Sequence, residues 1–194
     1  MTVMPGEDQG GSQAFKIVVT GPVGAGKTTF INTISEIETV STEAAISDGQ
    51  TLGEKTTTTV GMDFGRLTLS GGLELHLFGT PGQQRFDFMW DIVSHGMLGY
   101  IVLLDCARPE THAQAHDIIK HFRSRSDVPS LVAANKCSDL NALRPMLTSA
   151  LDLSDEDFLV PTDARRPAAV KQTLIELLEL VVAGLVDPSV PASV

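Results

Sequence analysis

The sequence predicts a three-layer α/β protein, with helices on both faces of a mostly parallel sheet that has one antiparallel edge strand. Two observations lead to this prediction. Short β-branched, apolar runs alternate with segments whose apolar residues recur at helical spacing, as is typical of parallel sheets. The runs at residues 60–69 and 73–78 are separated only by Ser70, Gly71 and Gly72, which predicts an antiparallel hairpin.

The expected elements follow one another along a single domain at residues 14–186. Strands are expected at residues 15–20, 60–69, 73–78, 99–105, 128–134 and 158–161, and helices at 29–37, 87–95, 111–123, 140–150 and 167–185. Residues 38–59 show little periodicity, and we expect a long functional loop there. Residues 1–13 are expected to be a disordered arm and residues 187–194 a flexible tail.

Composition excludes several classes of function. The net charge of −10 argues against a nucleic-acid partner, which usually requires a basic face. The sequence contains no run of 18 apolar residues, so no integral membrane segment is expected. The first residues lack the basic and apolar regions of a signal peptide, and the cysteines are only Cys106 and Cys137. We therefore expect a reduced, cytoplasmic setting.

Residues 21–28, Gly-Pro-Val-Gly-Ala-Gly-Lys-Thr, match the phosphate-loop pattern G-x-x-x-x-G-K-[ST] between an expected strand and an expected helix. In such a loop, backbone N–H groups and the helix N-terminus bind phosphates. Lys27 would reach the β- and γ-phosphates, and the Thr28 hydroxyl would ligate Mg²⁺. The sequence thus predicts a P-loop NTPase fold, with nucleotide contacts at Gly21, Val23, Gly24, Ala25, Gly26, Lys27, Thr28 and Thr29.

With these loops in this order, residues 15–186 resemble a small GTPase of the Ras superfamily. Residues 59–64, Thr-Val-Gly-Met-Asp-Phe, are similar to the T-[IV]-G-x-D-F first switch of Rab-type proteins. Residues 80–86, Thr-Pro-Gly-Gln-Gln-Arg-Phe, resemble the second switch, D-T-A-G-Q-E-R-F. The resemblance implies that Thr59 ligates Mg²⁺, that the Gly82 N–H binds the γ-phosphate and that Gln83 orients the attacking water.

One departure from the family pattern concerns the metal. The acidic residue that begins the second switch and supports Mg²⁺ is Gly79 here. Asp63, on the neighbouring expected strand, could replace it, or its side chain could face outward. The missing acid and Pro81 resemble the bacterial MglA-type and actinobacterial conservon GTPases, often described as ATP/GTP-binding proteins. That resemblance implies regulators and effectors of the roadblock/longin class, bound through the two switch regions.

A second departure concerns the base. Guanine recognition in the family uses N-K-x-D, whereas residues 135–138 here read Asn-Lys-Cys-Ser and an aspartate follows one residue late. Either the loop bulges so that Asp139 reaches the base, or Ser138 lies there. Residues 163–165 stand where the family has S-A-K. The resemblance implies base contacts from Asn135, Lys136, Ser138, Asp139, Asp163, Ala164 and Arg165, and favours GTP over ATP.

The resulting interpretation is a GTP-binding molecular switch that slowly hydrolyses GTP to GDP and phosphate and signals through partner proteins. Lys27 and Gln83 are its predicted catalytic residues, and Thr28 and Thr59 its predicted metal ligands. Thr58 occupies the position just before Thr59 where an arginine could stabilise the transition state, so we expect low intrinsic turnover. The alternative is a scaffold that binds GTP or ATP with little or no hydrolysis. Met89 and Trp90 are expected to anchor a partner.

Overall fold

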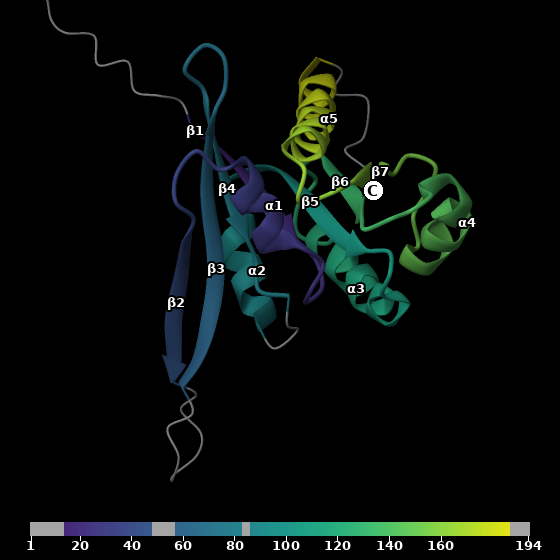
Figure 1. Ribbon diagram of the computed structural model, residues 1–194, viewed down its shortest axis with the longest axis horizontal. Coiled ribbons are helices and arrows are strands. Elements are labelled where there is room, and N and C mark those ends of the chain that lie inside the picture. Colours follow the sequence, from purple (N-terminus) through teal and green to yellow (C-terminus); the bar gives the residue numbers. More distant parts are fainter. Residues whose placement is uncertain (1–13, 48–56, 83–85, 187–194) are drawn as a thin grey trace, which may run out of the picture.

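The structure, a computed structural model, describes residues 14–47, 57–82 and 86–186, and only the backbone at 41–47 and 57–60 (Figure 1). The element order is β1 (Ala14–Thr20), α1 (Lys27–Ile34), β2 (Val40–Ser47), β3 (Thr57–Thr68), β4 (Glu74–Gly79), α2 (Asp87–Ser94), β5 (Met97–Asp105), the 3-10 helix η2 (Pro109–Thr111), α3 (His112–Arg123), β6 (Ser130–Asn135), α4 (Leu140–Leu151), β7 (Leu159–Thr162) and α5 (Pro167–Val186).

One seven-stranded sheet runs through the molecule in the order β2-β3-β4-β1-β5-β6-β7. The strands from β4 to β7 pair in parallel, while β3 is antiparallel to both β2 and β4. The predicted fold class is therefore confirmed. Because β1 lies between β4 and β5, the turn that follows it opens at the carboxyl edge of the sheet, where ligands of α/β proteins bind.

The long loop expected at residues 38–59 is wrong in part, because Val40–Ser47 forms the edge strand β2 and β3 already begins at Thr57. The sequence of β2 is rich in small and polar residues, so apolar patterning did not reveal it. Its backbone instead pairs residue by residue with β3, from Val40 opposite Phe64 to Ser47 opposite Thr57. Such pairing, rather than local propensity, decides the state of an edge segment. Residues 48–56 lie outside the described chain.

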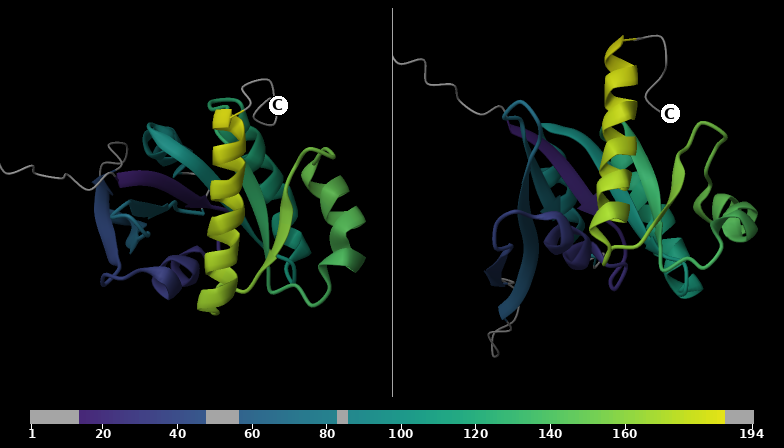
Figure 2. Two further views of the ribbon diagram at one scale, coloured as in Figure 1. Left: turned by 90° about the horizontal axis from the view of Figure 1, so that it is seen from above. Right: turned by 45° about the horizontal axis from the view of Figure 1, so that its top comes forward.

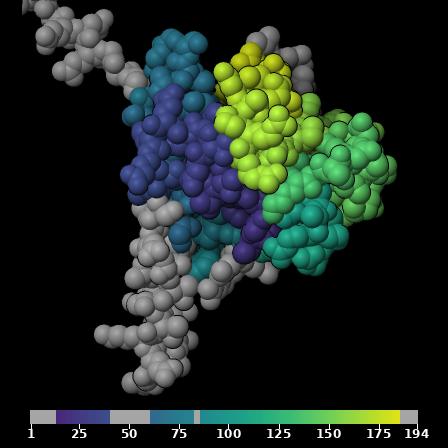
Figure 3. All heavy atoms as spheres, viewed as in Figure 1, coloured from purple at the N-terminus to yellow at the C-terminus, as the bar shows by residue number. Residues whose placement is uncertain are grey.

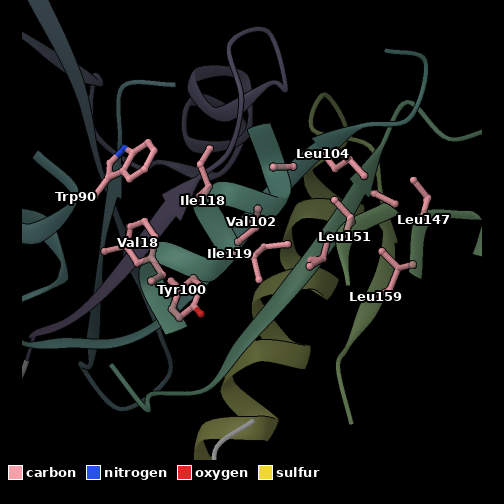
Figure 4. Packing of buried hydrophobic residues seen from close by; sticks show 14 of the residues in the cluster. Val18, Trp90, Tyr100, Val102, Leu104, Ile118, Ile119, Leu147, Leu151 and Leu159 are labelled. Atoms are coloured by element: carbon pink, nitrogen blue, oxygen red, sulfur yellow. The ribbon is translucent and has the colours of Figure 1, made fainter. Parts of the chain in front are cut away.

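Helices cover both faces of the sheet (Figure 2). α1 and α5 pack together on one face, over a core that includes Phe30, Ile31 and Leu177. α2, α3 and α4 cover the other face, where Trp90, Tyr100 and other apolar side chains form a second core (Figure 4). In the described part of the chain, none of the helices combines the length and apolar character that crossing a bilayer would take.

Candidate nucleotide-binding site

The phosphate-loop sequence lies in the tight turn between β1 and α1. Gly21 has a φ of 135°, and a Cβ atom there would lie 2.2 Å from the carbonyl oxygen of Leu103 on β5. Gly26 has a φ of 107°, and its Cβ would lie 2.6 Å from Nδ2 of Asn135. Only glycine permits both this backbone conformation and these approaches. The two glycines therefore pack the loop directly against the carboxyl ends of β5 and β6.

Lys27, the first residue of α1, has a buried ammonium group. Its side chain is 9% exposed, and Nζ donates hydrogen bonds to the carbonyl oxygens of Gly21 and Pro22, both at 2.7 Å. Burial lowers the pKa of Lys27 from 10.5 to about 8, against the opposing effect of the nearby Asp63 carboxylate. A buried cation held inside a glycine-rich turn is a place where a phosphate group can be bound.

Thr28 and Asp63 meet beside Lys27. The Thr28 hydroxyl donates a hydrogen bond to Oδ2 of Asp63 at 2.5 Å. Asp63 lies on β3 directly opposite Gly79 on β4. Of the two orientations that the sequence left open for Asp63, the structure has the one that faces the phosphate loop. A hydroxyl and a carboxylate together fit Mg²⁺, which prefers oxygen ligands.

The segment expected to form the second switch reaches the phosphate loop at Gly82. A Cβ atom at Gly82 would lie 2.6 Å from the backbone nitrogen of Val23 and 2.8 Å from Nζ of Lys27. The carbonyl oxygen of Gly82 accepts a hydrogen bond from Nε2 of Gln114 on α3 at 2.5 Å. The Gly82 backbone is thus fixed next to the predicted position of the phosphates.

Two predicted γ-phosphate residues are described incompletely or not at all. Gln83 lies outside the described residues. Thr59 is described only by its backbone, which lies in β3 opposite Ala45 of β2. Their roles in catalysis and metal binding stay predictions.

The predicted base-binding loops are tied to the phosphate loop by Asn135 and Lys136. The Asn135 side chain is 2% exposed; its Nδ2 donates to the carbonyl oxygen of Ala25 at 2.8 Å, and its Oδ1 accepts from the backbone N–H of Ala164 at 3.1 Å. Nζ of Lys136 donates to Oδ2 of Asp105 at 2.6 Å and to the carbonyl oxygen of Gly24 at 3.3 Å. These bonds hold the ends of β5, β6 and β7 against the first turn of the chain.

A cavity of about 310 Å³ connects the two ends of this site, a size within the range of small-molecule sites. The purple atoms of the N-terminal part border green and yellow atoms of the second half in Figure 3, so the site is assembled from distant parts of the sequence. Every residue that lines the cavity is one that the sequence predicted to contact the nucleotide: Gly24, Gly26, Lys27, Thr28, Thr29, Asn135, Lys136, Ala164 and Arg165. Gly21 and Ala25 are buried and Val23 is exposed, and none of the three lines this cavity.

Other predicted base contacts have different surroundings. Ser138 and Asp139 are not among the residues that line this cavity. Oδ1 of Asp139 accepts a hydrogen bond from the backbone N–H of Ala142 at 3.2 Å and so caps the N-terminus of α4. Asp163 pairs with Arg165 through Oδ1 and Nε at 3.1 Å, and this hydrogen bond lowers the pKa of the Asp163 carboxyl.

Sequence reasoning missed three side chains that support the site. Asp105 accepts the Lys136 ammonium, Gln114 holds Gly82, and Nη1 of Arg108 donates to the carbonyl oxygen of Val23 at 3.2 Å. Asp105 could have been found, because it ends a buried strand beside the phosphate loop. Arg108 and Gln114 carry no local pattern that points to the turn they contact.

The expected partner anchor at Trp90 is wrong, because its side chain is only 3% exposed and packs against α3. Trp90 Nε1 donates to the carbonyl oxygen of Pro81 at 3.2 Å, so the indole helps to hold the segment expected to form the second switch. Met89 is partly exposed, while Phe88 and Ile92 are the exposed large apolar residues of α2.

Comparison with known proteins places the chain among nucleotide-binding proteins. It is 34% identical over 122 residues to an uncharacterized protein of Methanocaldococcus jannaschii, covering 62% of this chain and 69% of the relative. It is 26% identical over 126 residues to human Ras-related protein Rab-22A (61% of this chain, 65% of Rab-22A, just under two thirds). Identity to Ras-related protein Rab-3 of Caenorhabditis elegans is 25% over 186 residues (91% and 78%).

These similarities confirm the resemblance at the level of a Ras-like nucleotide-binding protein; the relation to MglA-type and conservon GTPases stays a prediction. The model of one protein family matches residues 19–189, from the last residues of β1 through the whole of α5. The chain belongs to this family, which is described as conserved hypothetical ATP binding protein.

Proposed function

We propose that this protein is a molecular switch that binds GTP with Mg²⁺ and hydrolyses it slowly to GDP and phosphate. The observation that carries the proposal is the continuous cavity that runs from Lys27 and the phosphate loop to Asn135, Lys136 and Ala164. A chain of phosphates at one end and a base at the other is the ligand that this arrangement of charge and loops suits.

Lys27 would bind the β- and γ-phosphates through its ammonium group. In the free protein this group is satisfied by the carbonyl oxygens of Gly21 and Pro22. A triphosphate would supply anionic acceptors instead, and charge-assisted hydrogen bonds are about twice as strong as neutral ones. The same contacts would stabilise the negative charge that develops during phosphoryl transfer.

The switch would lie at Gly82 and Gln83. Gly82 is next to Lys27 and Val23, so its N–H can respond to the presence of a γ-phosphate, and Gln83 would then orient water for in-line attack. Thr28 and Thr59 would ligate the metal, which would neutralise phosphate charge when bound. Since Thr58 is not an arginine, we expect turnover to be slow until a partner protein supplies or reorganises charge.

The nucleotide that co-purifies with the protein tests the choice of GTP. The family is described by ATP binding, and Asp139 caps α4, so guanine recognition would rest on Asn135, Ala164 and Arg165 or on a loop movement. Chromatography and mass spectrometry of the extracted nucleotide should give GTP or GDP. Recovery of ATP or ADP alone would contradict the GTP assignment and leave triphosphate binding in place.

Hydrolysis is tested by Gln83→Leu. The substitution should slow single-turnover phosphate release many-fold and leave the affinity for a slowly hydrolysed analogue unchanged. If the wild type releases no phosphate with any candidate partner, the protein is instead a nucleotide-binding scaffold.

Partners of the roadblock/longin class are expected to bind at the switch segments. Phe88 and Ile92 of α2, which are 42% and 61% exposed, lie next to the second switch and offer apolar anchors. A Phe88→Ala/Ile92→Ser variant should lose this binding while it keeps its nucleotide. Unchanged affinity for such a regulator would place the interface elsewhere.

A further inference from the structure

The carboxylate of Asp63 occupies the space next to Gly79. A Cβ atom on Gly79 would lie 3.1 Å from Cβ of Asp63 and 3.2 Å from its Oδ2. The two residues face each other across the antiparallel pair of β3 and β4, and side chains at directly opposed positions point to the same face of a sheet. A side chain at position 79 and one at position 63 therefore reach the same volume.

This volume adjoins the hydroxyl of Thr28. Asp63 Oδ2 accepts the Thr28 hydroxyl at 2.5 Å, and its charge also acts on the ammonium of Lys27. The carboxylate is thus at the first turn of α1, on the side of the phosphate loop where a cation would neutralise the β- and γ-phosphates.

We infer that Asp63 supplies the acidic group of a divalent-cation site at Thr28, from β3 instead of from the start of the second switch at Gly79. The inference rests on the proposed function, because the nucleotide phosphates would complete the site. Mg²⁺ favours one or two carboxylates together with phosphate oxygens and water. Asp63 and Thr28 provide the protein oxygens for such a site, and Gly79 provides the room.

A purely structural role for Asp63 makes a different prediction. Asp63 could serve only to accept the Thr28 hydrogen bond and to offset the buried charge of Lys27. Asp63→Asn would then keep an acceptor for Thr28, and any damage from the lost charge would weaken nucleotide binding with and without metal. A cation-supporting role instead predicts that affinity falls in Mg²⁺ and does not fall in EDTA.

The test is calorimetric titration with GTPγS, and in parallel with ATPγS, in Mg²⁺ and in EDTA. For Asp63→Asn we expect affinity in Mg²⁺ to fall about 10- to 100-fold, the range seen when a metal-supporting group is removed. In EDTA we expect equal or tighter binding, because one negative charge near the phosphates is gone. Glu36→Gln is the matched control: it removes one charge from a carboxylate that bonds Thr68, and should change neither value.

A second variant moves the carboxylate from position 63 to position 79, where the Ras-like pattern has its acidic residue. Asp63→Ala/Gly79→Asp should recover most of the Mg²⁺ dependence. The Cβ of the new side chain would lie 2.8 Å from the flexible Cδ1 of Ile31 and 3.1 Å from the Cβ that alanine keeps at position 63, contacts that small shifts can relieve. Electron paramagnetic resonance of Mn²⁺ added to the GTPγS complexes should follow the same order of affinity. Circular dichroism would confirm that each variant is folded.

The outcomes separate the two proposals. Equal Mg²⁺ dependence in the wild type and Asp63→Asn overturns the metal site, and so does parallel weakening in Mg²⁺ and in EDTA. Analogue binding by the wild type that ignores Mg²⁺ also overturns it, with the proposed nucleotide binding intact. If neither analogue binds in either buffer, the proposed function fails and the metal site fails with it.

Discussion

Replacing Lys27 with methionine should remove a pH-dependent cost to the stability of the free protein and abolish triphosphate binding. Burial lowers the pKa of Lys27 from 10.5 to about 8, a difference of 2.5 units between those two values. At 1.36 kcal/mol per unit, keeping this ammonium charged inside the fold costs about 3 kcal/mol. Methionine is similar in length and carries no charge, so the variant avoids that cost.

The lowered pKa of Lys27 also predicts the direction in which the stability of the wild type changes with pH. As the pH falls from 10.5 to 8, the unfolded chain binds a proton at Lys27 that the folded chain does not bind, so the wild type loses stability. Below pH 8 both states are protonated and the loss is complete. Urea unfolding should therefore show that the stability of Lys27→Met relative to the wild type is about 2 kcal/mol higher at pH 7.5 than at pH 10.

This comparison cancels the other effects of the substitution. The lost hydrogen bonds to Gly21 and Pro22 weaken the variant at both pH values, since a neutral amine still donates. Lys171→Met, at an exposed position of α5, controls for the removal of a positive charge. A stability difference between Lys27→Met and the wild type that stays constant from pH 7.5 to 10 would refute the claim that the Lys27 ammonium is buried at an energetic cost. With GTPγS and Mg²⁺ added, only the wild type and Lys171→Met should gain stability.

Three further substitutions are expected to affect stability in different ways, each measured by urea unfolding. Gly21→Ala should lower the free energy of unfolding by more than about 3 kcal/mol, because its Cβ would collide with the Leu103 carbonyl. Gly61→Ala is the control: no atom lies within 4 Å of its Cβ, so stability should change by less than about 1 kcal/mol. Similar losses in the two variants would contradict the turn geometry. Asn135→Ala should cost roughly 2–3 kcal/mol through its two buried amide bonds, and a loss below about 0.5 kcal/mol would contradict it. Asp139→Ala should cost about 1 kcal/mol as a lost helix cap and leave the ratio of GTP to ATP affinity unchanged; a fall in that ratio would show that the carboxylate contacts the base.

The parts of the fold that the sequence predicted are those with strong local signals. The buried strands and the phosphate turn each carry their pattern within a few residues, and the structure has them within about two or three residues of the expected ends. β2 has no such pattern, because an edge strand is held by pairing with β3. The buried orientation of Trp90 depends on its contacts with α3 and Pro81, which spacing along α2 cannot supply.

The two departures from the Ras-like pattern have different structural consequences. The carboxylate missing at Gly79 has a counterpart at Asp63, which reaches the same volume from the paired strand. The carboxylate displaced to Asp139 instead satisfies a backbone N–H of α4, a group that would otherwise need another partner. Moving Asp139 to a base would leave that N–H without its cap and so cost about 1 kcal/mol. Affinity for the phosphates can therefore be strong without Asp139, and the proposed preference for guanine would rest on Asn135, Ala164 and Arg165 instead.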